Sequence, residues 1–424
     1  MYKNVQIGII GAGSVFTPEL IELILEKELD VSKIVFMDID SERLEILSSL
    51  AKRQIENSAM NIDIETSESY KDAIVDSDFI LLQPRVGKGH MRIEDEKLAH
   101  KYRIPYVETV SVPGLGSFLR TVPVYDEIAD LIKEHAPDAR IMNFANPAGP
   151  LTTYLHRIGL TNTVGVCNVP VSYVSSVAEI FDVPEESVSM NWKGVNHFAA
   201  ADEVLIDGKD VLPELAEKAA LGEYYFPFSL QVLKDTRLGL SPYFQWYLHS
   251  DERMEELLDK EKSRGQEVKE LEKELLDIYS RPETIEMPEL LKKRGGFKYS
   301  EVVANLIESF QTNNHQVHYI NVPNNGTLAS LSDETIIEVP AIVQNGEVFP
   351  LQAGDLPKFI KSFVSNMATV YDYWISAVLN KDGASLRKAL MLDPVFPDAK
   401  HSDNLLKELF EINKDYIEDF YTGS

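Results

Sequence analysis

Residues 5–20 have the sequence VQIGIIGAGSVFTPEL, and this stretch decides the fold. The apolar run over residues 5–11 is typical of a buried strand, and the pattern over residues 17–29 predicts a helix. Between them, Gly11, Gly13 and Ser14 belong to a glycine-rich turn, whose backbone N–H groups and following helix N-terminus can hold a pyrophosphate. The match to G-x-G-x-x-G is incomplete, because Phe16 takes the place of the third glycine. The turn indicates a dinucleotide site, with a plain tight turn as the alternative.

The next expected strand, KIVFMDID over residues 33–40, strengthens the dinucleotide interpretation. Its Asp38 lies 25 residues after Gly13, where an acidic side chain can bond a ribose hydroxyl and favour NAD over NADP. Asp40 is a weaker candidate, because Asp40 and Ser41 can instead cap the helix expected over residues 41–57, with Ser41 as the expected cap. We therefore expect NAD as a cofactor, bound at Gly11, Gly13, Ser14 and Asp38.

Strands and helices continue to alternate to about residue 165, with further strands expected over residues 78–84 and 139–147 and a helix over residues 124–136. Such alternation predicts an α/β fold with a Rossmann-like, doubly wound parallel sheet. The rest of the chain is mixed. The expected architecture is therefore that of the lactate and malate dehydrogenases: an NAD-binding domain over residues 1–165 and an α+β catalytic domain over residues 166–424.

Three segments of the second part have clear local patterns. Residues 251–280 predict one long, heavily charged helix, most of which is expected to be a solvated face with i,i+4 charge pairs. Residues 335–351 predict a hairpin, because Asn345 and Gly346 supply a turn with positive φ. From Leu356 onward the chain is expected to be helical again.

The charge and composition narrow the class of protein. The formal net charge is −27, with 41 basic and 68 acidic residues among 424, which disfavours nucleic acid and anionic membrane faces as partners. No apolar run reaches the roughly 18–20 residues that a membrane span needs. The N-terminus leads directly into the first strand without a signal-peptide pattern, and one cysteine excludes an internal disulfide. These features favour a cytoplasmic protein.

The single cysteine, Cys167, lies in GVCNVP over residues 165–170. A lone cysteine is most often a small buried apolar residue. Here, however, it follows an expected strand and precedes a proline-containing loop, where α/β sheets present ligands. His197 follows 30 positions later in GVNHF. A thiolate and an imidazole make half of a divalent-metal site. A closed zinc site is disfavoured for want of further cysteines, so an open site completed by substrate and water remains.

Four further segments complete the candidate site, and each also has a purely structural explanation. Arg85, Lys88 and Arg92 follow a core strand, either as ligand contacts or as a solvated turn. Asn146 can bond a sugar hydroxyl or make an Asx-turn. SPYFQWYLHS over residues 241–250 is aromatic at helical spacing, as core residues are, and KKRGGFKYS over residues 292–300 suits an anion or a plain loop.

Taken in order, these motifs resemble one family. GAGS-x-x-TPEL, Q-x-RVG-x-x-x-x-R-x-x-DE, N-x-x-NP-x-G, CNVP, the later NH and RGG-x-x-YS all occur between about residues 5 and 330. This ordered set is similar to glycoside hydrolase family 4, whose members use NAD and a divalent metal. Within the family the similarity is greatest to the 6-phospho-β-glucosidases. The NAD-dependent enzymes of this family are an exception to hydrolysis by two carboxylates.

The resemblance implies a mechanism and a set of site residues. The sugar is oxidised at C3 by NAD⁺, a tyrosine removes the C2 proton, the glycosidic bond breaks by elimination, water adds at C1, and the cofactor is restored. Tyr243 matches the tyrosine base. Cys167 and His197 match the ligands of the metal, Mn²⁺ in the family, which acts as a Lewis acid. Substrate contacts are implied for Arg92, Asn146, Asn168, Arg264 and Arg294, with the last two as alternatives for the 6-phosphate. The family also implies a homodimer or homotetramer.

Some positions bear on the substrate. The α-specific members have an aspartate after the cysteine, which resembles a general acid, whereas this chain has Asn168, which favours 6-phospho-β-glucosides as substrates. The chain departs from the family at Tyr106-Val107, where Gly-Gln is usual, and at Ser117, where a glycine is usual. These departures leave the leaving-group preference open. An α-glycosidase or uronidase of the same family remains an alternative, as do an NAD-dependent 2-hydroxy acid dehydrogenase and a noncatalytic NAD sensor.

Overall fold

The first half of the chain forms a parallel sheet. The structure is a computed structural model that describes residues 2–109, 111–221, 230–296, 298–396 and 398–421. The strands of the first half are β1 (Val5–Ile10), β2 (Val31–Met37), β3 (Asp63–Ser67), β4 (Phe79–Leu82), β5 (Arg140–Asn143) and β6 (Thr163–Val166). Their spatial order is β6-β5-β4-β1-β2-β3, and all five pairings are parallel. The order reverses at β1, as in doubly wound sheets, so the predicted Rossmann-like sheet is confirmed.

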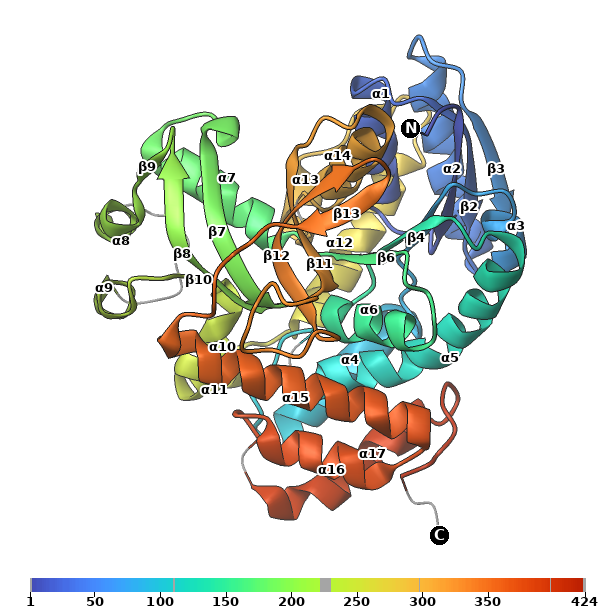
Figure 1. Cartoon of the computed structure of the whole chain (residues 1–424). Helices are drawn as coiled ribbons and strands as arrows, with labels where there is room; N and C mark the ends of the chain where they lie inside the picture. The colour runs from blue at the N-terminus through green and yellow to red at the C-terminus, as the bar shows by residue number, and fades with distance from the viewer. Residues whose placement is uncertain (1, 110, 222–229, 297, 397, 422–424) are drawn as a thin grey trace.

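Antiparallel strands of the second half extend this same sheet beyond β6. They are β7 (Val188–Val195), β8 (Phe198–Ile206), β9 (Lys209–Asp210), β10 (Gly239–Leu240), β11 (Val317–Pro323), β12 (Ile336–Gln344) and β13 (Glu347–Pro350). The edge sequence is β10-β8-β7-β12-β11-β6, with β13 on β12 and β9 on β8. The described strands therefore form one continuous sheet, seen from β8 on the left to β3 on the right in Figure 1.

Helices cover the first half of the sheet and join its strands. They are α1 (Thr17–Glu26), α2 (Ser41–Glu56), α3 (Tyr70–Ile74), α4 (Lys88–Lys101), α5 (Ser111–His135), α6 (Ala148–Arg157) and α7 (Val169–Phe181). Asp40, not the predicted Ser41, is the N-cap of α2, because its carboxylate accepts a hydrogen bond from the Arg43 N–H at 3.2 Å. The predicted helix over residues 124–136 is only the end of α5. Its earlier part contains Gly114 and Gly116, which are poor helix formers. A Cβ atom added at Gly114 would collide with Thr109, and one added at Gly116 would collide with Asp95.

The helices of the second half are more numerous. They are α8 (Leu212–Leu221), α9 (Leu230–Thr236), α10 (Gln245–Leu248), α11 (Ser250–Asp259), α12 (Arg264–Tyr279), α13 (Leu290–Arg294), α14 (Tyr299–Thr312), α15 (Lys358–Asn380), α16 (Gly383–Leu392) and α17 (Ser402–Asn413), with short 3₁₀ turns at 185–187, 242–244 and 399–401. The single helix predicted over residues 251–280 is wrong, because Ser263 and Gln266 form a capping box that starts α12 afresh.

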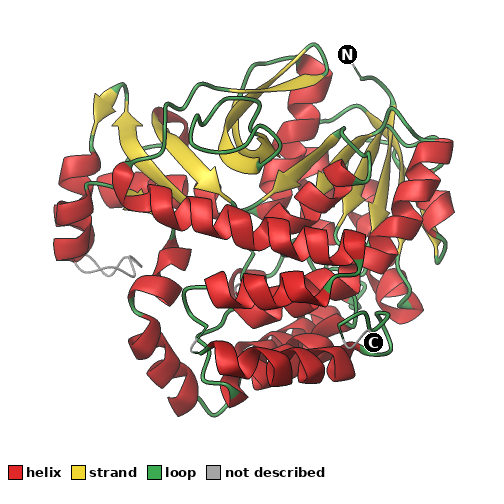
Figure 2. Cartoon of the chain, turned by 60° about the horizontal axis from the view of Figure 1, so that its bottom comes forward, coloured by secondary structure: helices red, strands yellow, loops and turns green. Residues whose placement is uncertain are grey.

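The remaining local predictions are confirmed. Residues 336–350 form the β12–β13 hairpin, with φ of 53° at Asn345 and 80° at Gly346. The three C-terminal helices α15–α17 lie together beneath the sheet in Figure 1, and Figure 2 shows stacked helices below the strands. The main hydrophobic core includes side chains from β1 through α17. Among the described residues, none of the helices has the length and apolar character that crossing a membrane requires.

Candidate active site

The glycine-rich turn lies at the carboxyl ends of β1 and β2. Gly11 has φ of 90°, and a Cβ there would come within 2.7 Å of the Gln83 backbone. A Cβ on Gly13 would come within 2.6 Å of the Asp38 carboxylate, which instead accepts a hydrogen bond from the Gly13 N–H at 2.8 Å. The second carboxylate oxygen of Asp38 accepts from the Asp40 N–H at 2.9 Å. Close packing therefore requires glycine at both positions and orients Asp38 at this edge.

These residues fit a dinucleotide. Ser14 precedes the first turn of α1, so the helix N-terminus and small residues meet where a pyrophosphate binds in such sheets. A carboxylate keeps lone pairs beyond the two that Asp38 uses, so it can still accept from a ribose hydroxyl. Ile39 beside it is 70% exposed, which leaves apolar surface next to that carboxylate. Asp40 caps α2 and pairs with Lys88 at 2.7 Å, a structural role.

The two expected metal ligands are both buried, and each lies just after the end of a strand. Cys167 follows β6, and His197 occupies the turn between β7 and β8. They are 1% and 2% exposed. The Nδ1 atom of His197 lies 3.0 Å from the Thr109 hydroxyl, which leaves Nε2 as the nitrogen that can ligate an ion. Burial lowers the pKa of His197 to about 3, and the resulting neutral imidazole is the form that binds metals.

Tyr243 stacks directly on His197. Their ring centroids are 3.7 Å apart and the planes differ by 3°. Burial, together with Cys167 and Glu108, raises the pKa of the Tyr243 hydroxyl, and a hydrogen bond from Thr109 and the charge of Arg92 oppose this only in part. Thr109 therefore contacts both the imidazole and the phenol. The structure brings three of the predicted residues, Cys167, His197 and Tyr243, into one cluster.

Asn146 joins this cluster through Tyr299. Its side chain hydrogen bonds the Tyr299 hydroxyl, and Tyr299 lies close enough to Cys167 for the two groups to interact. The Oδ1 atom of Asn146 is buried and has no hydrogen-bond partner in the described part of the chain. A buried carbonyl oxygen without a partner is rare in proteins. It marks a position where a bound group would complete the hydrogen bonding.

The cluster fits a divalent ion with an open coordination sphere. One thiol and one imidazole nitrogen are donors that suit borderline transition metals. Within the described ranges no group of three or more histidine, cysteine, aspartate or glutamate side chains could hold a metal ion. A fully protein-held site is therefore not formed there, and substrate and water oxygens would have to supply the remaining ligands.

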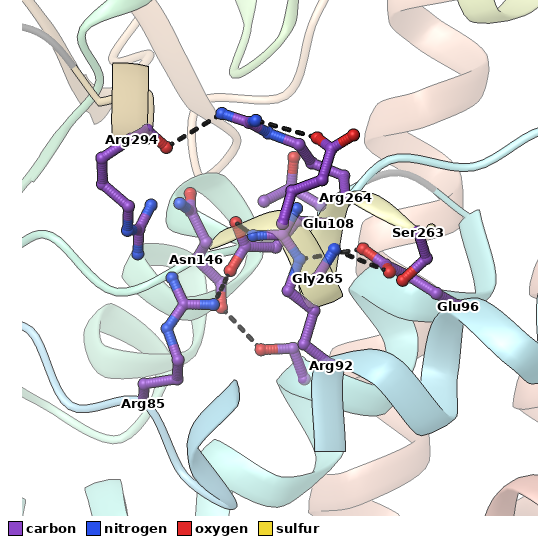
Figure 3. Close-up of polar contacts among 12 residues, drawn as sticks. Arg85, Arg92, Glu96, Glu108, Asn146, Ser263, Arg264, Gly265 and Arg294 are labelled. Atoms are coloured by element: carbon purple, nitrogen blue, oxygen red, sulfur yellow. Dashed lines mark hydrogen bonds and ion pairs between the residues drawn. The ribbon is translucent and has the colours of Figure 1, made fainter. Parts of the chain in front are cut away.

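Three arginines surround Glu108 beside this cluster (Figure 3). The Glu108 carboxylate pairs with Arg92 at 3.0 Å and also with Arg85. Burial alone would raise the pKa of Glu108, but the charges of Arg85, Arg92 and Arg294 outweigh it and lower the pKa to about 2. Three guanidinium groups that converge on one side of the site in a strongly acidic protein offer donors that suit an anionic substrate group.

Further acidic residues pair with the arginines of this cluster. Glu96 accepts from Arg92 Nε at 2.9 Å with one oxygen and from the Gly265 N–H at 2.9 Å with the other. Glu272 pairs with Arg294 at 2.8 Å. Arg264 donates to the backbone carbonyls of Lys293 and Arg294 at 2.9 and 3.1 Å, as Figure 3 shows for Arg294. Arg264 thus fixes the carboxyl end of α13, which carries Arg294.

Contacts also join the arginines to the glycine-rich turn. The Arg294 guanidinium lies 5.7 Å from the centroid of the Phe16 ring. Arg43 donates to the Gly13 carbonyl at 2.7 Å and pairs with Glu272 at 3.1 Å. The turn predicted to bind NAD and the predicted substrate residues therefore belong to one connected site.

Among the predicted residues, Asn168 lies less deeply. It is the N-cap residue of α7, directly after Cys167, and is partly exposed. Sequence reasoning assigned no role to Glu108, Thr109, Tyr299 or Glu338. Glu108 and Thr109 follow the stretch that departs from the family pattern, and Tyr299 lies in the RGG-x-x-YS motif, so a signal existed for these three. None existed for Glu338.

Two family models match the chain: the family 4 glycosyl hydrolase model over residues 6–183, and that of the family 4 glycosyl hydrolase C-terminal domain over residues 192–396. The 6-phospho-beta-glucosidase BglT of Thermotoga maritima is 31% identical, covering 97% of this chain and 99% of its own. A probable 6-phospho-beta-glucosidase of Bacillus subtilis is 33% identical and covers 99% of both chains.

Solved structures agree. The T. maritima 6-phospho-beta glucosidase with NAD and glucose-6-phosphate has a TM-score of 0.91 at 31% identity, covering 97% of this chain and 99% of its own. Another of its structures contains manganese, NAD⁺ and glucose-6-phosphate, with a TM-score of 0.91 at 29% identity and coverage of 98% and 99%. A Plasmodium falciparum malate dehydrogenase, with a TM-score of 0.57 at 14% identity and coverage of 89% and 99%, shares the fold alone.

The chain belongs to family 4 of the glycosyl hydrolases. The predicted family is therefore confirmed, and so is the predicted dehydrogenase-like architecture.

Proposed function

We propose that this family 4 enzyme hydrolyses 6-phospho-β-glucosides and uses NAD and a divalent metal, Mn²⁺, as cofactors. The observation that carries the proposal is the convergence of Cys167, His197 and Tyr243 beside a cluster of arginines. The T. maritima relative whose structure contains manganese, NAD⁺ and glucose-6-phosphate supports both cofactors and the phosphosugar. A plain hydroxy-acid dehydrogenase would need neither the thiol nor the stacked tyrosine.

The cofactors have separate places in this proposal. Gly11, Gly13, Ser14 and Asp38 bind NAD, and Cys167 and His197 bind the metal. When bound, NAD⁺ is a reversible hydride acceptor and the divalent ion is a Lewis acid toward sugar oxygens. The chain's own residues orient the sugar and move protons between its carbons and water.

Tyr243 is the proposed base that accepts the C2 proton of the sugar. A buried tyrosine is a weak base by itself, and burial raises the pKa of Tyr243 further. Additional positive charge at the site is therefore essential. Proton removal at C2 lets the glycosidic bond break by elimination. Addition of water at C1 and return of a proton to C2 then complete the hydrolysis without net consumption of NAD.

Substrate binding is assigned to the polar residues around this base. Asn146 and Arg92 bind the sugar, which would satisfy the unpartnered Oδ1 of Asn146. Arg294 binds the 6-phosphate, since its guanidinium faces the same region as Arg92 (Figure 3). Arg264 contributes by holding the Arg294 backbone. Bidentate contacts from guanidinium groups suit phosphate.

The β-anomeric preference follows from Asn168. The side chain after the metal-binding cysteine is an amide, which has no acidic proton to give to a leaving group. A family member that needs a general acid there would lack it. Water or a good leaving group suffices for the β-type reaction, and this favours 6-phospho-β-glucosides over 6-phospho-α-glucosides or uronides.

The division of labour along the chain is part of the proposal. Residues 1–165 bind NAD, and residues 166–424 supply the metal ligands and Tyr243. The change from parallel to antiparallel strands after β6 supports a boundary there. We also propose a cytoplasmic homodimer or homotetramer, in keeping with a phosphorylated substrate and a free, buried thiol.

Hydrolysis of 4-nitrophenyl β-glucoside 6-phosphate in D₂O tests the function. The reaction is run with and without NAD⁺ and Mn²⁺, and the unphosphorylated glucoside is the control. We expect hydrolysis only with both cofactors and deuterium at C2 of the product. Equal rates with the unphosphorylated sugar would contradict the phosphate assignment, and hydrolysis without deuterium uptake would contradict the elimination mechanism.

A further inference from the structure

A buried carboxylate lies behind the proposed metal ligands. Glu338 on β12 is 0% exposed. Its Oε2 accepts a hydrogen bond from Trp192 Nε1 at 2.9 Å, and its Oε1 accepts from Asn196 Nδ2 at 2.9 Å and from Asn321 Nδ2 at 3.3 Å. The Cys167 thiol also hydrogen bonds this carboxylate. Four donors from four segments therefore converge on one side chain.

The sheet register creates this convergence. Glu338 is paired with Gly194 of β7 on one side and with Asn321 of β11 on the other, and Asn321 is paired with Gly165 of β6. Cys167 follows Gly165 by two residues. Glu338 therefore lies in a row of paired residues across the sheet. The row begins at Gly165, two residues before Cys167, and reaches Gly194, two residues before the β7–β8 turn.

The contact with Asn196 bears directly on His197. Asn196 and His197 are the two turn residues between β7 and β8, and His197 has φ of 70°. A histidine in the left-handed region is strained and persists only where its surroundings fix it. Asn196 is fixed at both ends of its amide, because Nδ2 donates to Glu338 and Oδ1 accepts from the Gly149 N–H at 3.2 Å. One carboxylate therefore contacts the Cys167 thiol and holds His197 through Asn196. A metal-bound cysteine is a thiolate with no proton to donate, so the contact that persists with an ion bound is the one through Asn196.

A bound metal ion would also account for a carboxylate at this buried position. Among the ion pairs of the described residues, none joins Glu338 to a lysine or arginine. A buried carboxylate without a cationic partner is costly. A divalent ion bound to a thiolate carries one remaining positive charge, which a single nearby carboxylate would balance. Outer carboxylates that orient metal ligands are a common feature of metal sites.

We propose that Glu338 is a positioning residue for the metal, which holds His197 through Asn196, lies against Cys167 and balances the charge of the bound ion. The inference rests on the metal assignment of the proposed function. It predicts that loss of the carboxylate weakens metal binding more than it weakens the fold or the NAD site.

The test compares Glu338→Gln with Val343→Ala, a core variant on the same strand. Val343 is fully buried on β12, five residues from Glu338. Mn²⁺ affinity is measured from the electron paramagnetic resonance signal of free Mn²⁺, in the presence of NAD⁺ and glucose 6-phosphate. The melting temperature without metal and the NAD⁺ affinity are measured for each variant. Co²⁺ binding reports the cysteine through its thiolate charge-transfer absorption.

We expect Glu338→Gln to raise the Kd for Mn²⁺ about 10–100-fold, as for other outer ligands, and to weaken the cobalt–thiolate absorption. Its NAD⁺ affinity should stay unchanged, and Val343→Ala should lower only the melting temperature. Asn196→Ala supplies a second perturbation, and should also weaken Mn²⁺ binding. Adding Glu338→Gln to it should cost less than in the parent, because the two side chains act through one contact.

Three results would overturn the inference. One is a Kd for Mn²⁺ within twofold of the parent in both Glu338→Gln and Asn196→Ala. Another is an equal loss of Mn²⁺ affinity in Val343→Ala. If the parent itself binds no Mn²⁺, the metal assignment of the proposed function fails together with the inference, whereas the first two results leave that assignment intact.

Discussion

Replacement of Glu108 by glutamine tests the electrostatics of the arginine cluster. Glu108→Gln keeps the shape of the side chain but removes the charge that pairs with Arg85 and Arg92. The pKa of Glu108 falls from its usual 4.5 to about 2, because the three arginines outweigh burial. Each pKa unit of that difference corresponds to about 1.4 kcal/mol. The carboxylate therefore stabilises the folded protein by about 3 kcal/mol at pH 7.

The expected change in melting temperature follows from the length of the chain. Unfolding entropy is about 2.1 cal/mol/K per residue, or about 0.9 kcal/mol/K for 424 residues. A loss of about 3 kcal/mol should therefore lower Tm by about 3–4 °C at pH 7. Calorimetry without NAD⁺ and metal is the assay, because bound ligands would shift Tm themselves.

The pH dependence has a definite sign. A carboxyl whose pKa is depressed by folding stabilises the folded state above the unfolded pKa, and the stabilisation is lost as pH falls toward the folded pKa. The difference between parent and Glu108→Gln should thus be constant above pH 4.5 and shrink between pH 4.5 and 2, to less than half at pH 3.

Glu65→Gln is the matched control. Glu65 pairs with Lys33 at 2.7 Å, but its side chain is 53% exposed, so its loss should cost at most about 1 kcal/mol. A Tm change below 1 °C in Glu108→Gln at pH 7, or the same change at pH 3 as at pH 7, would refute the argument that this cluster is strongly coupled.

Three further predictions concern the proposed cofactors and base. Cys167→Ser and His197→Ala should each abolish Mn²⁺-dependent hydrolysis with an unchanged circular dichroism spectrum; full activity in either would remove the metal assignment. Tyr243→Phe should suppress exchange of the sugar C2 proton with D₂O, followed by NMR, and unchanged exchange would mean that another group is the base. Asp38→Ala should weaken NAD⁺ binding at least about tenfold, since it removes a charged acceptor worth about 1.5–3 kcal/mol; an unchanged Kd by fluorescence titration would rule out its ribose contact.

Helix boundaries show which parts of the structure the local sequence can predict. The break between α11 and α12 was present in the sequence as Ser263 followed by Gln266 three residues later, a capping-box pattern. The start of α5 was not, because Gly114 and Gly116 disfavour a helix locally. Both glycines are needed for close approach to Thr109 and Asp95, residues that the local pattern does not reveal. Tertiary packing overrode propensity there.

The sequence by itself determined the parallel half of the sheet, the dinucleotide turn and the family. Apolar runs, helical periodicity and glycine positions are local signals, and the ordered motifs are read along the chain. The same motifs indicated Cys167, His197 and Tyr243 as site residues, but they did not show that these side chains lie together.

Only the tertiary structure decided how those side chains meet. The stacking of Tyr243 on His197, the Glu108 cluster and the contact of Glu338 with Cys167 join residues that lie far apart in the chain. Glu338 lies on a strand of ordinary hairpin pattern, and nothing local distinguishes it. Its position depends on the insertion of β12 between β7 and β11, a register fixed by long-range strand pairing and burial.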